Sequence, residues 1–172
     1  HAALSKNGAF VGSHPMAGSE KTGLKHANVD LFKDRPCFVT PLDNTSPSAV
    51  DSVIRFWKAL DMQVATLSPE SHDEIVAHVS HLPHVLATTL AASLNGKNQS
   101  WAAFSGNGLR DTTRIASGSP TMWRDICEQN REEILLALSD FEAKLHELQS
   151  ALRNKDFFHL QHFQSHKVIF LK

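Results

Sequence analysis

Histidines are the residues of this sequence with the clearest chemical potential. There are eleven in 172 residues, with no tyrosine, and His72, His78, His81 and His84 fall within thirteen positions. Histidine titrates near neutral pH, so it can act as an acid, a base, a hydrogen-bonding group or a metal ligand. On an ideal helix His72 lies about half a turn from His81. This spacing favours a polar, anion-accepting pocket, or rings hydrogen-bonded inside a kinked bundle, over a metal site.

Two further motifs carry groups that suit an acid–base or anion-binding site. His14, in HPMAG, lies between a strand end and a proline, where it is either a positioned acid or base or a solvated loop residue. Arg110-Asp111-Thr112-Thr113-Arg114 follows a glycine loop. Arginine binds carboxylates with a fork of two donors, although an arginine near an aspartate is commonly a surface ion pair. The sequence contains no Gly-x-Gly-x-x-Gly and no phosphate-binding loop motif.

The elements that must position these groups are short at the start of the chain and helical afterwards. Strands are predicted at 9–13, 36–40 and 63–66, and an amphipathic helix starts after Ser46-Pro47. A longer helix is predicted over 69–94 with a kink at Pro83. A helical turn at 101–105 and helices over 120–129 and 131–155 follow. The prediction is one mostly helical domain with a small strand segment at its start.

The last long helix has a heptad pattern. Its apolar residues follow one another at intervals of 4, 3, 4, 3 and 4 residues: Ile134, Leu138, Phe141, Leu145, Leu148 and Leu152. This spacing is typical of a core-facing helix or of a helix that pairs with a second subunit. Residues 156–172, rich in His and Phe, form either a terminal helix or a partner-dependent segment.

Composition excludes several classes of protein. With 41% hydrophobic and 20% charged residues and a net charge of −1, the chain differs from a disordered tail and has no electrostatic footprint for nucleic acid. No run approaches the roughly 18 apolar residues of a membrane span. Cys37 and Cys127 form no Cys-x-x-Cys motif, so we expect two reduced thiols in a cytoplasmic protein.

Several segments together resemble one enzyme family. FVGSHPMAGSEKTG, Leu31-Phe32, a strand ending in TP, SPESHDEIVAHVSHLPH and GLRDTTRIASGSPTMWRDI are similar, in order and approximate spacing, to the prephenate/arogenate dehydrogenase family of tyrosine biosynthesis. The resemblance runs from about residue 10 to residue 126. That family has a nucleotide-binding Rossmann domain followed by a helical dimerisation domain.

The resemblance implies a mainly α fold. Residues 45–172 would form a helical bundle for dimerisation and substrate binding, similar to the C-terminal domain of 6-phosphogluconate dehydrogenase. Residues 1–44 would form the end of the nucleotide-binding domain and an active-site loop. The cofactor would be bound mainly by a domain absent from this chain, so we expect the chain to be inactive alone.

The resemblance also implies roles for individual residues. His14 matches the catalytic histidine, which accepts a hydrogen bond from the ring hydroxyl as hydride leaves for the nicotinamide. Arg114 matches the arginine that binds a substrate carboxylate. The remaining implied site residues are the pocket histidines His72 and His84, the gating residue Glu20, Arg110 at a position where the family commonly has lysine, and Asp111 and Trp123 at the end of the site nearest the dimer partner.

The implied reaction is the NAD- or NADP-dependent oxidative decarboxylation of prephenate to 4-hydroxyphenylpyruvate by a homodimer. The alternatives are an arogenate dehydrogenase and a non-catalytic helical domain for dimerisation or ligand binding. No metal, nucleic acid or membrane is expected to bind.

Overall fold

The computed structural model describes residues 10–18 and 23–165 of the chain. A small sheet of strands β1 (Gly12–Pro15), β2 (Pro36–Thr40) and β3 (Gln63–Thr66) has the order β1-β2-β3. β1 is antiparallel to β2 and β3 is parallel to it. Cys37 and Val39 of β2 are fully buried. The predictions for β2 and β3 are confirmed.

β1 begins three residues later than predicted. The sequence interpretation treats the glycine in AFVGS as a strand end, but Gly12 starts the pairing, opposite Thr40. A Cβ at Gly12 would lie 2.4 Å from Thr40 Oγ1. The close approach of the two strands therefore explains a glycine at a paired position.

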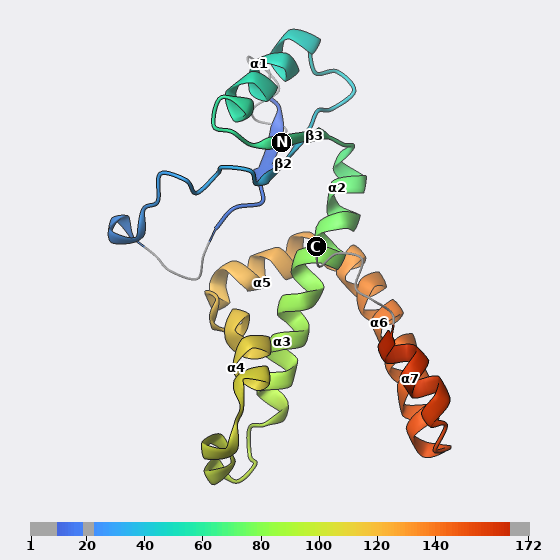
Figure 1. The fold of residues 1–172 in the computed structure, drawn as a ribbon. Helices are drawn as coiled ribbons and strands as arrows, with labels where there is room; N and C mark the ends of the chain where they lie inside the picture. Colours follow the sequence, from blue (N-terminus) through green and yellow to red (C-terminus); the bar gives the residue numbers. More distant parts are fainter. Residues whose placement is uncertain (1–9, 19–22, 166–172) are drawn as a thin grey trace.

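Helix α1 (Pro47–Lys58) connects β2 to β3 and packs against both. Its start is as predicted, because Ser46 Oγ accepts a hydrogen bond from the Ala49 N–H at 3.3 Å and Pro47 follows it. Figure 1 shows α1 beside the sheet, apart from the later helices. The structure therefore groups residues 45–66 with the sheet, whereas the sequence interpretation divides the chain after residue 44. A crossover helix and a bundle helix share the same apolar period, so the pattern did not distinguish them.

The central helix is interrupted where a kink is predicted. It consists of α2 (Pro69–Val76), a π-helical turn η2 (Ala77–His81) and α3 (Leu82–Ser93). Within the turn, the Leu82 N–H donates to the carbonyl of Ala77, five residues back. Pro83 follows at once and has no N–H to donate to the preceding turn.

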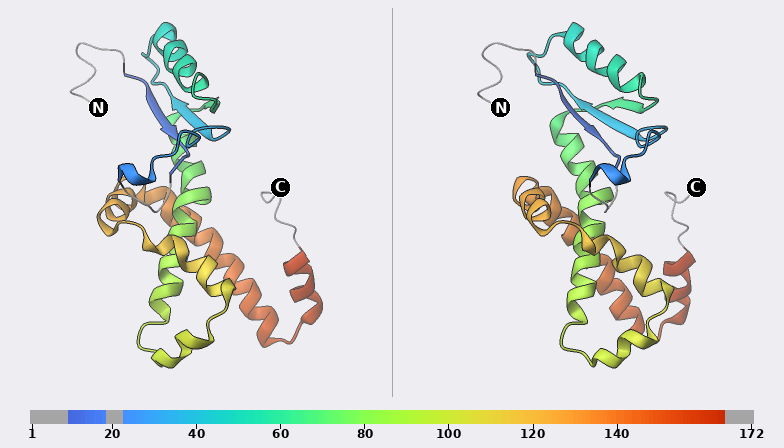
Figure 2. Two further views of the ribbon diagram at one scale, coloured as in Figure 1. Left: turned by 60° about the vertical axis from the view of Figure 1, so that its left-hand side comes forward. Right: turned by 90° about the vertical axis from the view of Figure 1, so that its left-hand side faces the viewer.

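Seven further helices are described, and three of them pack against the central helix. The seven are η1 (Leu24–His26), η3 (Gln99–Phe104), α4 (Asn107–Thr113), η4 (Arg114–Ser117), α5 (Pro120–Gln129), α6 (Arg131–Arg153) and α7 (Phe157–Ser165). The run Pro69–Ser93 is long and apolar enough for a membrane span, with a mean hydropathy of 1.2. It packs against α4, η4 and α6, and 28% of its apolar window is buried within the described chain. Figure 2 shows that α6 begins next to the central helix, near the π-turn, and then diverges from it.

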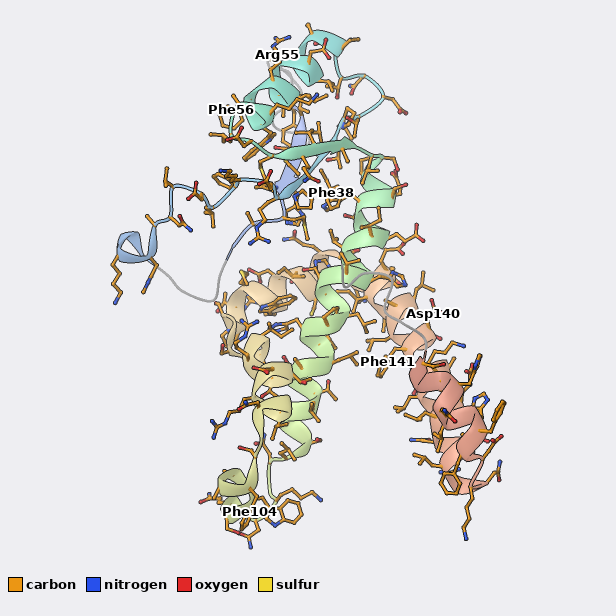
Figure 3. The ribbon with its side chains drawn as sticks, in the orientation of Figure 1. Phe38, Arg55, Phe56, Phe104, Asp140 and Phe141 are labelled. Carbon is orange, nitrogen blue, oxygen red and sulfur yellow. The ribbon has the colours of Figure 1, made fainter. Side chains whose placement is uncertain are left out.

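The heptad pattern on α6 divides into two parts. At its start, Ile134 is buried and forms a core cluster with Ala77 and Ala137, against which Leu138 packs. Farther along, Phe141, Leu145 and Leu152 are 38%, 40% and 56% exposed, and Phe141 is visible on α6 in Figure 3. Residues 157–165 of the tail form α7, which packs against α6. The described residues thus bury the start of the pattern, whereas in its second part only Leu148 is half-buried.

Candidate active site

A cavity of about 580 Å³ lies where the end of β1 meets the central helix, η4 and α5. Four of the predicted site residues line it: His14, His84, Arg114 and Trp123. His81, which the sequence interpretation does not select, lines it as well. Elements that are distant in sequence therefore bring together a set of rings and one guanidinium.

Behind His14, a chain of two hydrogen bonds leads away from the cavity. His14 Nδ1 lies 2.8 Å from His72 Nε2, and His72 Nδ1 lies 2.8 Å from Asp73 Oδ1. His72 does not itself line the cavity, but its ring contacts both His14 and Phe38 of the sheet. His72 is thus brought to the site as a partner of His14.

The acceptor at the end of this chain sets the direction of both bonds. A carboxylate only accepts, so His72 Nδ1 carries the proton and donates it to Asp73. In a neutral His72 the Nε2 atom is then an acceptor, and His14 Nδ1 must donate to it. The second nitrogen of a neutral His14 is left with a lone pair. This is the form in which an imidazole accepts a proton.

The surroundings of His14 favour its neutral form. Burial, and next the neighbouring His72, lower the pKa of His14 below the ordinary value for histidine. Near pH 7 the ring is therefore uncharged and able to act as a base.

The π-turn explains how histidines on different helical faces approach one site. Nine residues of ideal α-helix place His72 and His81 about 180° apart, but one extra residue in a π-turn removes roughly 100° of that separation. The sequence interpretation used the ideal helix for this pair. Within the described part of the chain, no group of three His, Cys, Asp or Glu side chains is arranged to hold a metal ion.

His84 and Trp123 form one wall of the cavity. Their rings are stacked, with centroids 3.4 Å apart and planes 5° from parallel. Burial lowers the pKa of His84, and a hydrogen bond to the backbone of Ile115 acts against that shift. Gly118 packs against both rings, since a Cβ there would lie 2.5 Å from Trp123 Nε1 and 3.3 Å from His84 Cε1. The pair offers a flat, mostly uncharged surface.

The other predicted site residues differ in their placement. Arg114, the first residue of η4, lines the cavity. Arg110 and Asp111 lie on α4 and are not among the residues that line it. Glu20 falls outside the described residues. The cavity of this single chain therefore has one cationic side chain, Arg114, among its described lining residues.

Comparison with known proteins agrees with this division of the chain. Residues 1–66 match the nucleotide-binding domain of prephenate dehydrogenase, and residues 68–164 match the prephenate dehydrogenase dimerisation domain. The two matches meet next to Leu67, at the end of β3.

Individual relatives point the same way. The chain is 33% identical over 163 residues to a cyclohexadienyl dehydrogenase of Zymomonas mobilis, covering 92% of this chain and 56% of that protein. Its structure resembles the prephenate dehydrogenase of Aquifex aeolicus in complex with hydroxyphenyl propionate and NAD+, with a TM-score of 0.84 and 34% identity over 90% of this chain and 55% of that one. It also resembles the arogenate dehydrogenase of Synechocystis, with a TM-score of 0.79 and 25% identity over 94% of this chain and 62% of that one.

The chain thus spans 56%, 55% and 62% of the lengths of these three proteins. Both of its parts, the sheet with α1 and the helices that follow, match domains of one enzyme family. The chain belongs to the prephenate dehydrogenase family.

Proposed function

We propose that this chain supplies the substrate pocket and the catalytic base of a prephenate dehydrogenase. The observation that carries the proposal is the Asp73–His72–His14 hydrogen-bond chain at a cavity that Arg114 also lines. A base with a fixed lone pair beside a carboxylate-binding group suits the oxidation of a ring alcohol that carries carboxylates.

His14 accepts the proton of the substrate's ring hydroxyl as that carbon is oxidised. The proton goes to the free nitrogen of His14, and the hydrogen bond to His72 holds the resulting imidazolium in place. The bond to the departing carboxyl group supplies the electron pair that completes the aromatic ring, carbon dioxide leaves, and His14 returns the proton to the ring oxygen, which is again a hydroxyl in the product. Arg114 binds a second substrate carboxylate, and the stacked His84 and Trp123 lie along the same cavity.

The nicotinamide of NAD or NADP, when bound, supplies the hydride acceptor for this reaction. The described residues do not fit the phosphates of a dinucleotide, because this sequence has no glycine-rich loop that leads from a strand to a helix N-terminus. We therefore propose that these 172 residues alone do not reduce NAD or NADP. NAD and NADP stay equal alternatives.

The substrate can be prephenate or arogenate, which differ in a keto-acid or an amino-acid side chain. The neutral histidines and Arg114 favour the keto acid, because none of these groups offers a negative charge to an ammonium group.

We also propose that the protein is a homodimer that pairs through α6, since Phe141, Leu145 and Leu152 are exposed on that helix. We expect Arg110 and Asp111 to approach a site in the dimer rather than within one chain.

Absorbance of reduced nicotinamide tests the proposed reaction directly. The intact gene product is mixed with prephenate, and NAD and NADP are tried separately. We expect a signal that disappears in His14→Asn. A signal with arogenate but not with prephenate would show that arogenate is the substrate. No signal with either substrate or cofactor would overturn the proposal in favour of a non-catalytic domain for dimerisation or ligand binding.

A further inference from the structure

The side chain of Asn130 does not form the helix cap that its position predicts. Asn130 is the residue before α6, where asparagine commonly caps the helix with its side-chain oxygen, yet it makes no such bond. Its amide nitrogen Nδ2 instead crosses to the central helix, where it lies 2.8 Å from the carbonyl oxygen of Asp73 and 3.2 Å from His81 Nδ1. One amide group thus links the start of α6 to the π-turn.

This geometry fixes the orientation of the amide. A backbone carbonyl only accepts, so the atom of Asn130 that faces Asp73 must be the nitrogen and not the oxygen. Its second hydrogen is then available to His81 Nδ1, which acts as the acceptor. In the neutral ring the proton consequently sits on Nε2.

His81 Nε2 is not fully buried, and the ring that carries it lines the cavity. Every fully buried side-chain nitrogen or oxygen among the described residues has a hydrogen-bond partner, and the bond to Asn130 is made by the other ring nitrogen. His81 is only 8% exposed but lines the cavity. The N–H at Nε2 is therefore a donor that water or a ligand in the cavity can meet.

We propose that Asn130 is a positioning residue that holds His81 as a hydrogen-bond donor to an anionic oxygen of the substrate. The part of this inference that concerns turnover rests on the proposed function. His14 would then accept a hydrogen bond from the ligand, and His81 would donate one to it. The acceptor Asp73 leaves His14 with a lone pair, and the donor Asn130 leaves His81 with an N–H.

Electrostatics support a neutral donor at this position. Burial lowers the pKa of His81, and the nearby His14 and His72 lower it further, against a smaller opposite effect of Asp73. A ring that is neutral near pH 7 has a single N–H donor. The ring nitrogen that carries this proton is the one that does not accept a hydrogen bond from Asn130. Without that contact the proton can sit on either nitrogen.

Three variants of the intact gene product test the inference through KM and kcat. In Asn130→Asp, an oxygen faces His81 Nδ1 and draws the proton there, so Nε2 turns its lone pair to the substrate. We expect KM to rise about 10- to 100-fold, the value of a hydrogen bond to a charged group, with kcat changed less than about threefold. In Asn130→Ala the proton is unconstrained, and KM should rise less. In His81→Gln the side-chain amide offers its own donor, so adding Asn130→Asp should have no further effect on KM.

The pH dependence separates this role from a structural one. At lower pH the ring of His81 in Asn130→Asp becomes protonated on both nitrogens and regains its donor, so KM should fall towards the wild-type value. Asn154→Asp, at the other end of α6, is the matched control and should leave KM unchanged. A larger rise in KM in Asn130→Ala than in Asn130→Asp would contradict the proposal. So would a rise in KM on adding Asn130→Asp to His81→Gln that equals the rise in the wild-type background.

A readout without substrate keeps the inference independent of the reaction. Nitrogen-15 NMR of histidine-labelled protein reports which ring nitrogen of His81 carries the proton. We expect Nε2–H in the wild type and Nδ1–H in Asn130→Asp above pH 7. Nδ1–H in the wild type would overturn the proposal even if the enzyme is active. Nε2–H in a protein that oxidises neither prephenate nor arogenate would uphold the positioning and reject the proposed function alone.

Discussion

The indole of Trp123 lies flat against the imidazole of His84, with ring centroids 3.4 Å apart, and Gly118 leaves the space that both rings occupy. A Cβ at Gly118 would meet Trp123 Nε1 at 2.5 Å and Trp123 Cδ1 at 2.9 Å. The indole cannot retreat towards His84, because that ring is already in contact and only 7% exposed. The glycine is therefore needed for the shape of this cavity wall.

Gly118→Ala should displace Trp123 and loosen the cavity. Overpacking of this kind costs about 1–3 kcal/mol of unfolding free energy, and we expect a lower melting temperature together with a raised KM. Gly108→Ala is the matched control, because a Cβ there meets no atom within 4 Å. It should change stability by less than about 1 kcal/mol. Equal melting temperatures and KM values for the two variants would refute the steric argument.

Asp73→Asn should lower kcat while leaving the fold intact. An amide can donate to His72 Nδ1, which moves the His72 proton to Nε2 and turns that atom into a donor towards His14. The proton of His14 then sits on the nitrogen that should accept from the substrate. We expect kcat to fall at least about tenfold, but less than the 10²–10⁴-fold loss expected on removing the base in His14→Asn.

Asp140→Asn is a suitable control for this change. Asp140 is exposed on α6 and lies 3.7 Å from His78, which is not among the residues that line the cavity. Steady-state kinetics should show a lowered kcat in Asp73→Asn and an unchanged kcat in Asp140→Asn. An Asp73→Asn enzyme with the kcat of the Asp140→Asn enzyme would show that the orientation of His72 does not matter for turnover.

The pH profile of kcat/KM should report the base in the free enzyme. Because His14 must be unprotonated, activity should rise with pH through its pKa, and the midpoint should lie below about 6.5. His72→Gln keeps an acceptor for His14 but removes one of the two causes of the lowered pKa. Its midpoint should therefore move to higher pH while staying below that of an unburied histidine. A midpoint that moves to lower pH would contradict this assignment.

Local patterns predicted the elements better than their contacts. The serine caps at Ser46 and Ser68 and the prolines after them mark the starts of α1 and α2, because a cap is a property of three or four neighbouring residues. Pro83 predicts an interruption of the central helix but not that the interruption is a π-turn. The bond from Leu82 to Ala77 depends on Pro83 and on the helices packed around it.

The candidate site shows the same difference between motif and contact. His14 and Arg114 were identified through their motifs, and both line the cavity. His81 belongs to the histidine cluster but not to the residues that the family resemblance carries over, so the sequence interpretation does not select it. Asn130 belongs to no motif, and its contact with His81 joins residues 49 positions apart in the sequence. Only the contact between α6 and the central helix reveals that its side chain serves His81.

The free energy of unfolding should fall as the pH is lowered below the pKa of an unfolded histidine, about 6.5. The pKa values of His14, His81 and His84 are all lowered in the folded protein, mainly by burial. Below about pH 6.5 the unfolded chain therefore binds more protons than the folded one, and unfolding becomes easier as protons are added. The stability that these rings provide is complete above the unfolded pKa of about 6.5 and decreases below it.

Thermal unfolding between pH 7.5 and 5.5 checks this expectation. The melting temperature should decrease with pH, and less steeply in His81→Gln, where one buried titrating ring is gone. His26→Gln, at an exposed position outside the cavity, should keep the wild-type slope. A melting temperature that rises on acidification would contradict the directions of these pKa shifts.

Charge placed on the exposed part of the α6 pattern should dissociate the proposed dimer. Phe141 and Leu145 lie one turn apart and are 38% and 40% exposed, so a second copy of the helix is the natural cover for them. In Leu145→Glu, each subunit loses an apolar contact worth about 1.5–3 kcal/mol and buries a carboxylate in its place. We expect the dissociation constant to rise at least about 100-fold.

Sedimentation equilibrium over a range of concentrations measures this change. Ala143→Glu adds the same carboxylate to α6 outside the heptad positions, and it should leave the dimer intact. Because Leu145 is already exposed within one chain, the variant should stay folded, so a monomer would report lost pairing rather than unfolding. A wild-type protein that is monomeric at high micromolar concentration, or a Leu145→Glu dimer as tight as the Ala143→Glu dimer, would show that α6 does not form the interface.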